Sequence, residues 1–299
     1  MAATAFEVPE PEGLLRVVFA GASTVQGFPH PRRLSAARVF QEMLSDATGR
    51  PVQVVNLGVT SLASFAVVRI VEHAVELDPN VIVVYTGHNE FYGIYGIGGS
   101  NRLHYELMDW RLPLALRRLV DSLRGTRVSS AALLETLSRK GEVDSDDPRR
   151  VQAARSLRAN LEDLADLGEQ HGIPIVLCTL AANDAGFAPA GSSSPPIDGE
   201  AMTAWMAHVS RAERLRTVPK AHREMIAHLD SAASLSDDHA WPTFLRGVAL
   251  HNAGSNDEAS HHFLRARELD TLPWRAPARH NREIREVAAA RDAVDLADV

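Results

Sequence analysis

The sequence predicts a three-layer α/β/α domain on a parallel sheet of about five strands, with an all-helical insertion. Short apolar runs rich in β-branched residues alternate with stretches whose apolar residues recur at helical spacing. This alternation, with short connections, is typical of helices that cover both faces of a parallel sheet. Over residues 217–270 the pattern becomes purely helical. The expected division is an α/β part over 12–216, a helical insertion over 217–274, and a last helix and strand over 275–299.

Five short apolar runs are expected to form the sheet. They are Leu14–Ala20, Val52–Gly58, Val81–Thr86, Ile173–Thr179 and Ala293–Leu296. The stretches between them predict helices over 34–48, 64–76, 110–124, 129–138, 148–170 and 281–290. The stretch Gly87–Gly99 is rich in glycine and aromatic residues, and Asn183–Glu200 is rich in proline and serine, so both are expected to be loops.

Composition excludes several classes of protein. The 299 residues are 45% hydrophobic and 23% charged, as in an ordinary globular protein. A net charge of −7 disfavours a nucleic-acid partner. No apolar run reaches the roughly 18 residues of a membrane span, and the acidic start Met1–Pro11 lacks the order of a signal peptide. As written, the chain is expected to be cytoplasmic. If the native N-terminus is missing, a membrane-anchored or extracytoplasmic location is expected instead.

The only cysteine, Cys178, lies inside one of the apolar runs. A lone cysteine in a strand pattern is most often a small core residue, so neither a disulfide nor a nucleophilic role is expected for it.

Polar or small residues follow three of the predicted strands. The first strand is followed by Gly21-Ala22-Ser23-Thr24, the second ends in Asn56-Leu57-Gly58, and the third leads into Gly87-His88-Asn89-Glu90. Because parallel strands present their carboxyl ends at one edge of the sheet, these groups can converge. A serine hydroxyl beside a glycine N–H and an asparagine amide forms a nucleophile with oxyanion donors, as acyl transfer requires. For the first stretch alone, an ordinary polar turn is the alternative.

These three blocks resemble the SGNH, or GDSL-type, hydrolase family over Val17–Asn89. The block Gly-His-Asn-Glu-Phe, here Gly87–Phe91, resembles a subgroup that carries a helical-repeat insertion before its last strand. The resemblance implies a flavodoxin-like sheet and an ester hydrolase that works through an acyl-enzyme on Ser23. It implies that the oxyanion donors are the N–H groups of Ser23 and Gly58 and the side chain of Asn89. It implies no metal and no organic cofactor. The substrate would be a small-molecule or glycan ester.

The helical stretch contains a second resemblance. Small residues and one aromatic residue fall at the spacing of a tetratricopeptide repeat, namely Gly247, Ala249, Gly254, Ala259, Phe263 and Ala266. The segment Ala240–Asp270 resembles one such repeat. A single repeat cannot bury its own face, so it is expected to pack on the helix over 219–235 and on the main domain. The repeat gives the chain a candidate surface for a protein partner.

Two departures from the family pattern concern catalysis. Ala22 stands where the family usually has an aspartate. None of the 13 histidines lies in the Asp-x-x-His block that supplies the family's general base, and Asp237-Asp238-His239 has the wrong spacing. His88 and His30 are the substitutes to consider. However, neighbours at a strand end point to opposite sides, so His88 is expected to be structural when Asn89 faces the serine. Glu90 is expected to brace its loop.

Three hypotheses about function follow. The first is a serine ester hydrolase, which is expected to be weak because the chain ends before an Asp-x-x-His block. The second is a non-catalytic interaction protein in which the helical repeat binds a partner and the hydrolase domain is a scaffold. The third is acyl transfer to a polysaccharide, which would use the same residues.

Overall fold

The computed structural model describes residues 12–93 and 141–299, which belong to two compact units. The first unit contains the sheet and includes residues 152–180 and 282–299 besides the N-terminal part of the chain. The second unit includes 142–151 and 181–281. The helices expected over 110–124 and 129–138, and the end of the glycine-rich stretch, lie outside the described residues.

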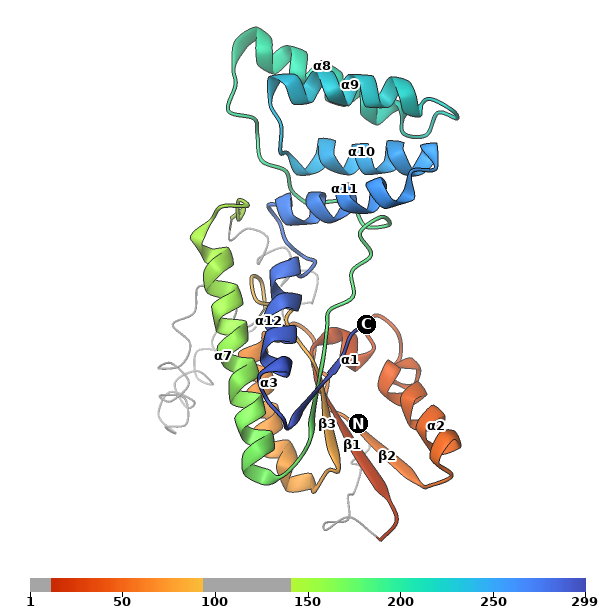
Figure 1. Cartoon of the computed structure of the whole chain (residues 1–299), viewed down its shortest axis with the longest axis vertical. Coiled ribbons are helices and arrows are strands. Elements are labelled where there is room, and N and C mark those ends of the chain that lie inside the picture. Colours follow the sequence, from red (N-terminus) through yellow and green to blue (C-terminus); the bar gives the residue numbers. More distant parts are fainter. Residues whose placement is uncertain (1–11, 94–140) are drawn as a thin grey trace, which may run out of the picture. The chain divides into compact units, whose positions relative to one another are not determined.

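The first unit is built on five parallel strands in the order β2-β1-β3-β4-β5 (Figure 1). Their bounds are β1 (Leu15–Gly21), β2 (Val52–Asn56), β3 (Val81–Tyr85), β4 (Ile175–Cys178) and β5 (Val294–Ala297). In the register, Phe19 of β1 lies opposite Asn56 of β2, and Gly21 of β1 lies opposite Tyr85 of β3. The expected parallel sheet of five strands is confirmed.

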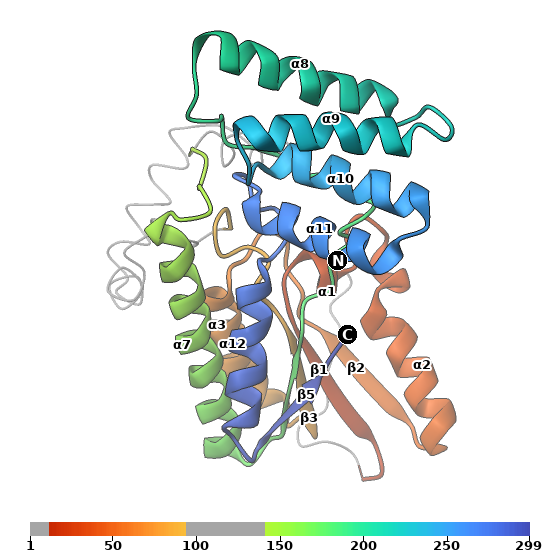
Figure 2. The same ribbon diagram turned by 45° about the horizontal axis from the view of Figure 1, so that its top comes forward.

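Helices cover both faces of this sheet, so the three-layer prediction is also confirmed (Figures 1 and 2). On one face, α2 (Ala36–Thr48) packs Phe40 and Leu44 against a core that contains Val17, Val83 and Cys178. The other face carries α3 (Ser64–Ala74), α7 (Pro148–His171) and α12 (Ala278–Ala289). Arg158 of α7 forms ion pairs with two glutamates of α12, Glu283 and Glu286.

Strand β1, which lies inside the sheet between β2 and β3, is buried on both of its faces. Val17 and Val18 are neighbours with side chains on opposite faces, and neither is exposed at all. This explains why β1 is continuously apolar from Val17 onward rather than alternating. Cys178 of β4 is also part of the core, and burial raises the pKa of its thiol to about 11. The thiol therefore stays protonated and packs as a small apolar group, as expected.

The second unit is a stack of four helices. They are α8 (Gly199–Leu215), α9 (His222–Leu235), α10 (Ala240–Ala253) and α11 (Asn256–Leu269), and each packs on the next (Figure 1). One core lies among α8, α9 and α10 and includes Met225, Leu229 and Leu245. A second core lies between α10 and α11, where the rings of Phe244 and Phe263 are 5.4 Å apart.

The helical part begins earlier in the chain than the expected boundary at Thr217, which lies between α8 and α9. In α8, Val209, Ala212 and Leu215 belong to the same core as the residues of α9. Their spacing is helical, so the signal for α8 is present in the sequence. By contrast, the expected loop over 183–200 has no regular structure as far as Asp198.

The close contact between α10 and α11 depends on a glycine. A Cβ on Gly247 would lie 2.7 Å from ring carbons of Phe263, which is closer than packed atoms approach each other. We therefore expect Gly247→Leu to lower the free energy of unfolding of the helical unit by about 1–3 kcal/mol, as overpacking does.

Denaturant unfolding followed by circular dichroism measures this effect. Ala253→Leu is the matched control, because Ala253 lies on the same helix and is exposed. Equal stability of Gly247→Leu and the wild type would contradict the described packing.

Candidate active site

Ser23 begins α1 (Ser23–Gln26), the single helical turn that follows β1. Its carbonyl oxygen accepts the backbone N–H groups of Gly27 and Phe28, both at 3.0 Å, so the main chain fixes the turn. The residue is half-buried. Within the described residues, neither its hydroxyl nor its backbone N–H has a hydrogen-bonding partner. Ser23 is therefore held by its backbone, and its polar groups remain available to a ligand.

Gly58 lies directly after β2 and against the turn that carries Ser23. A Cβ at this position would overlap the backbone nitrogen of Gln26, so only glycine allows the approach. However, the N–H of Gly58 donates to the side-chain oxygen of Asn56 at 2.9 Å. The group expected to be an oxyanion donor is thus already used within the protein.

Asn56 connects several parts of this region through one side chain. Besides accepting from Gly58, it donates from Nδ2 to the carbonyl of Val25 at 2.7 Å and to the hydroxyl of Ser35 at 3.2 Å. Ser35 is the N-cap of α2 and is buried. Sequence reasoning placed Asn56 at a strand end without a role. The sequence signal that could have indicated a role for Asn56 was its position as a polar residue at the end of a buried apolar run.

Asn89 lies in the turn that follows β3. The N–H of Gly93 donates to the backbone oxygen of Asn89 at 2.7 Å, which closes the turn. The side-chain amide donates one hydrogen to the carbonyl of Leu62 at 2.8 Å. A primary amide has two N–H donors, and in the described part of the chain the second has no partner. The Leu62 bond therefore orients the amide while one donor stays unused.

Glu90 has a different environment from its neighbour Asn89. Its side chain is buried, with the residue only 4% exposed, and both carboxylate oxygens accept from Ser64. The backbone N–H of Ser64 is 2.9 Å from Oε1, and its hydroxyl is 2.8 Å from Oε2. Burial raises the pKa of Glu90 to about 7, although the two bonds from Ser64 lower it. Glu90 braces the loop, as expected from the sequence.

The three predicted site residues lie at one edge of the sheet. Ser23, Gly58 and Asn89 follow β1, β2 and β3, and these strands are neighbours in the order β2-β1-β3. Ser23, which begins α1 directly after β1, therefore lies between the other two along this edge. This is the arrangement that the strand-end argument requires. The roles of the three residues in catalysis stay predictions.

The two histidines considered as a base take different positions. The ring of His88 lies beside the ring of Tyr85, with centroids 5.3 Å apart. His30 is exposed, and its backbone N–H donates to Gly27 at 2.8 Å. Neither histidine hydrogen-bonds to the Ser23 hydroxyl. In this structure, therefore, neither histidine is hydrogen-bonded to the predicted nucleophile.

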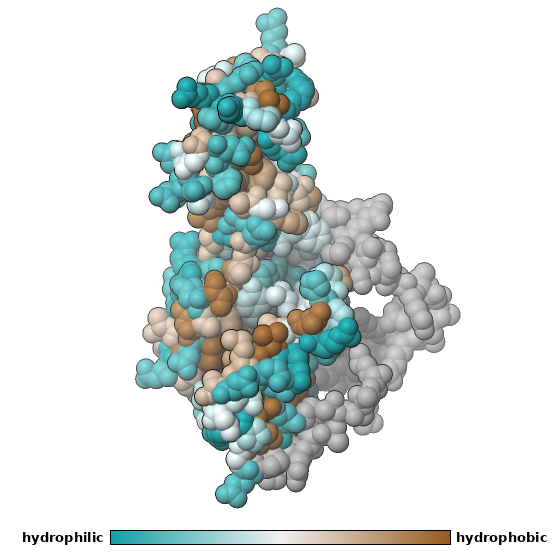
Figure 3. Space-filling model, turned by 90° about the vertical axis from the view of Figure 1, so that its right-hand side faces the viewer, coloured by the Kyte–Doolittle hydropathy of each residue, from teal (hydrophilic) through white to brown (hydrophobic). Residues whose placement is uncertain are grey.

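Large apolar side chains lie next to the loops of the site. Phe28, whose backbone bonds to Ser23, is 58% exposed, and Val59, which follows Gly58, is 44% exposed. Leu34, Val39 and Met43 are exposed further along, before and within α2. Figure 3 shows hydrophobic side chains on the face that carries α2. Two apolar side chains thus extend into solvent close to the turn that carries Ser23.

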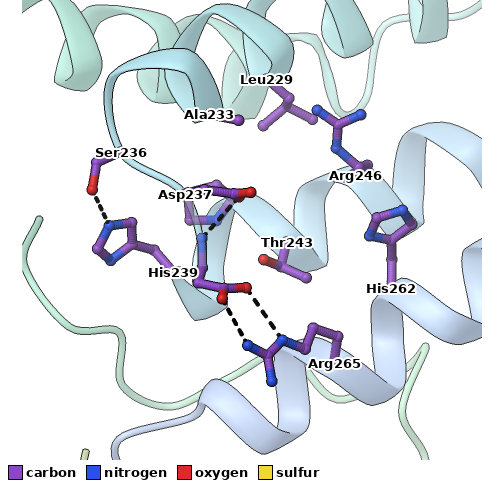
Figure 4. Close-up of a pocket in the computed structure, with 11 residues that line it drawn as sticks. Leu229, Ala233, Ser236, Asp237, His239, Thr243, Arg246, His262 and Arg265 are labelled. Atoms are coloured by element: carbon purple, nitrogen blue, oxygen red, sulfur yellow. Dashed lines mark hydrogen bonds and ion pairs between the residues drawn. The ribbon is translucent and has the colours of Figure 1, made fainter. Parts of the chain in front are cut away.

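A separate pocket of about 350 Å³ lies in the helical unit (Figure 4). Residues of α9, α10 and α11 and of the α9–α10 loop line it, and charged groups surround it. Arg265 pairs with Asp238 at 2.8 Å, and Arg246 pairs with Asp230 at 2.5 Å. Burial and the nearby Arg246 lower the pKa of His262, so this imidazole is neutral at pH 7. The lining of the pocket combines polar and apolar groups, and both of its arginines are already paired.

Comparison with known proteins gives structural matches only. No model of a known protein family matches the sequence, and no curated protein matches it. Solved structures that are similar include AlinE4, an SGNH-hydrolase family esterase, with 15% identity over 58% of this chain and 64% of that chain and a TM-score of 0.33. They also include TesA, with 15% identity over 56% of this chain and 61% of that chain and a TM-score of 0.32. The chain spans about three fifths of the length of these proteins.

Among the described helices, none is both long and apolar enough to cross a membrane.

The position of the turn that carries Ser23 depends on Asn56. Asn56→Ala would leave the N–H of Gly58 and the carbonyl of Val25 without these partners, so we expect it to slow labelling of Ser23 by a fluorophosphonate about tenfold or more. The rate of covalent labelling, read by intact-protein mass spectrometry, measures the effect.

Gln41→Ala is the matched control. Its amide oxygen accepts the N–H of Val54 at 3.0 Å, so it also bonds a side chain to β2, but away from Ser23. Equal loss of labelling in both variants would show that Asn56 acts only through general stability.

Proposed function

We propose that this protein is a serine ester hydrolase whose nucleophile is Ser23. The observation that carries the proposal is that the hydroxyl and the backbone N–H of Ser23 have no hydrogen-bonding partner among the described residues. Ser23 lies between Gly58 and Asn89 at the carboxyl edge of the sheet. The second N–H of the Asn89 amide is unpartnered there as well. Acyl transfer needs a nucleophile next to donors of this kind.

The proposed reaction proceeds through an acyl-enzyme. The Ser23 oxygen forms a bond to the carbonyl carbon of the ester while the carbonyl electron pair moves onto its oxygen. The N–H of Ser23 and the free N–H of Asn89 donate to this oxyanion. The carbon–oxygen bond to the alcohol then breaks, and the alcohol leaves with the proton lost by Ser23. Water attacks the acyl-enzyme in the same way, which releases the acid and restores the serine.

Gly58 enters this scheme as a conditional third donor. Its N–H is bound to Asn56 at 2.9 Å, so an oxyanion must share that hydrogen or displace the Asn56 oxygen. In contrast, Ser23 and Asn89 can donate without breaking any described bond. We therefore assign the larger part of oxyanion stabilisation to Ser23 and Asn89.

We propose further that the 299-residue chain turns over slowly. Its sequence contains no Asp-x-x-His block, and among the described residues no histidine hydrogen-bonds to the Ser23 hydroxyl. A protonated serine attacks poorly at pH 7. In enzymes that lack one member of a catalytic triad, the remaining groups still give about 10³–10⁴-fold catalysis over water.

The substrate we propose is an ester of a small molecule or a glycan. Phe28 and Val59 are exposed on the two loops that flank Ser23. Such side chains favour an apolar group next to the ester bond, because its contact with them removes apolar surface from water. Transfer of the acyl group to a polysaccharide would use the same residues and would differ only in the acceptor that replaces water.

The second candidate function is a non-catalytic interaction protein. The observation that favours it is the pocket among α9, α10 and α11, which has no part in the chemistry proposed for Ser23 (Figure 4). In this alternative, the resemblance to a tetratricopeptide repeat reflects binding of a protein partner, and the sheet is a scaffold. An unreactive Ser23 would favour this candidate over the hydrolase.

Replacement of the nucleophile is the direct test. We expect Ser23→Ala to abolish fluorophosphonate labelling and to reduce turnover of a short-chain aryl ester to the background rate. Asn89→Ala should retain the nucleophile and cost about 10²–10³ in rate, as loss of one oxyanion donor does. Equal aryl-ester turnover by the wild type and Ser23→Ala would end the hydrolase proposal.

The two histidines are tested separately. Because neither bonds to the Ser23 hydroxyl, we expect His88→Ala and His30→Ala each to leave the rate of aryl-ester hydrolysis within about threefold of the wild type. Loss of a working general base would instead cost about 10²–10⁴-fold. A loss of that size in either variant would identify the base and contradict the proposed slow turnover.

A further inference from the structure

We propose that Glu90, bound to Ser64 at the start of α3, is the positioning residue that holds the Asn89 amide in place for the oxyanion. The proposal rests on the hydrolase function proposed above, because it gives Glu90 a role only through Asn89. It assigns a function to a buried carboxylate that does not itself take part in the reaction.

The loop after β3 is attached to the start of α3 at two adjacent residues. Asn89 donates to the carbonyl of Leu62, and Glu90 accepts from the N–H and the hydroxyl of Ser64. Ala63 lies between these two partners and is also in close contact with the loop, because a Cβ on Gly93 would lie 3.1 Å from its nitrogen. The amide of Asn89 and the carboxylate of Glu90 are thus fixed to the same short segment.

A third element secures this attachment from the other side. Asn160 of α7 donates from Nδ2 to the hydroxyl of Ser64 at 2.8 Å. Ser64 is fully buried and Asn160 is nearly so. Ser64 therefore receives one hydrogen bond from α7 and gives two to Glu90. The chain Asn160–Ser64–Glu90 leaves the carboxylate little freedom to move.

The same bonds exclude a catalytic role for Glu90 in this structure. Both of its oxygens are occupied by Ser64, and the residue is 4% exposed. A buried carboxylate costs free energy unless it is well hydrogen-bonded, and an apolar side chain would avoid that cost. What the carboxylate provides is a fixed connection between the Asn89 turn and the N-terminus of α3, where an anion is also favoured.

Glu90 can change its charge near neutral pH. The pKa of Glu90 is set by burial and by the two hydrogen bonds from Ser64. Among the described residues, no charged side chain contributes to the shift. Below a pH of about 7 the carboxyl is protonated, and the bond with the Ser64 hydroxyl must reverse its direction. The ionised form accepts both hydrogens of Ser64 in charge-assisted bonds, which are stronger. The hydrogen bonds between Ser64 and Glu90 should therefore be strongest above pH 7, although the buried charge costs the folded state free energy there.

A double-mutant cycle on the labelling rate of Ser23 separates positioning from general stability. At about pH 8 we expect Glu90→Gln and Ser64→Ala each to slow fluorophosphonate labelling about tenfold, since the charge-assisted bonds become neutral or are lost. In an Asn89→Ala background, Glu90→Gln should cause no further loss of labelling rate.

Glu72→Gln is the control, because Glu72 lies on α3 but is paired with Arg69 near the surface. At about pH 5.5, where Glu90 is neutral, the wild type and Glu90→Gln should label at equal rates.

Thermal unfolding gives a readout that needs no reactive serine. The pKa of Glu90 is higher in the folded protein, about 7, than its ordinary value of 4.5, so the folded state binds more protons in this interval. The contribution of Glu90 to stability is therefore full below about pH 4.5 and is lost as the pH rises through about 7. Glu90→Gln should have a smaller drop in Tm than the wild type between about pH 5.5 and about pH 8.

The outcomes are distinguishable. If Glu90→Gln slows labelling by the same factor in the wild-type and the Asn89→Ala backgrounds, the proposal is overturned, because Glu90 then acts independently of the Asn89 amide. Unchanged labelling of Glu90→Gln at about pH 8 would overturn it too. A wild type that does not label at all would overturn the hydrolase function and the positioning role together. In that case, the pH dependence of Tm would still show whether Glu90 titrates near pH 7 in the folded protein.

Discussion

One asparagine side chain holds together the parts of the sheet edge on which the site depends. Asn56 ends β2, and its amide binds Gly58, Val25 and Ser35 at once. It thereby connects the end of a strand, the turn that carries Ser23 and the first residue before α2. Because Gly58 has no side chain, its backbone lies against the same turn. The position of Ser23 is thus fixed by its neighbours, while its own side chain makes no described contact.

Both units use a buried carboxylate to fix a loop. In the first unit, Glu90 binds the backbone and hydroxyl of Ser64. In the second, Asp270 is 1% exposed and accepts the backbone N–H groups of Ala190, Gly191 and Leu272. Burial raises the pKa of each carboxyl, and backbone donors lower it. A carboxylate can accept several N–H groups that a loop cannot pair with itself, so it replaces the hydrogen bonds that regular structure would provide.

The sheet could be predicted from the sequence because its signal is local. Val17, Val18 and their neighbours form a continuous apolar run, and such runs at short intervals define a parallel sheet. The placement of Ser23, Gly58 and Asn89 at one edge follows from that topology alone. The bond from Gly58 to Asn56 could not be predicted in this way. Both groups are at a strand end, but which donor meets which acceptor depends on side-chain angles that the pattern does not contain.

The remaining differences have similar causes. The partners of Glu90 come from α3 and α7, and Asn160 is far from Glu90 in the sequence, so a bracing role could be expected but its partners could not. The boundary of the helical unit depends on which core α8 joins. Its apolar spacing predicts a helix, yet only the packing of Val209 and Leu215 against α9 assigns it to the second unit.

Unpartnered polar groups support our proposal that this edge of the sheet binds a ligand. Within the described residues, the hydroxyl and N–H of Ser23 and one N–H of Asn89 have no partner, and two buried oxygens, those of the Gln26 amide and the Thr86 hydroxyl, have none either. These residues belong to the turns after β1 and β3. Nearby, Asn56, Glu90 and Ser64 are fully bonded, so the region can satisfy its polar groups. A scaffold would gain stability by pairing the others too, whereas an enzyme must leave donors and a nucleophile open for its substrate.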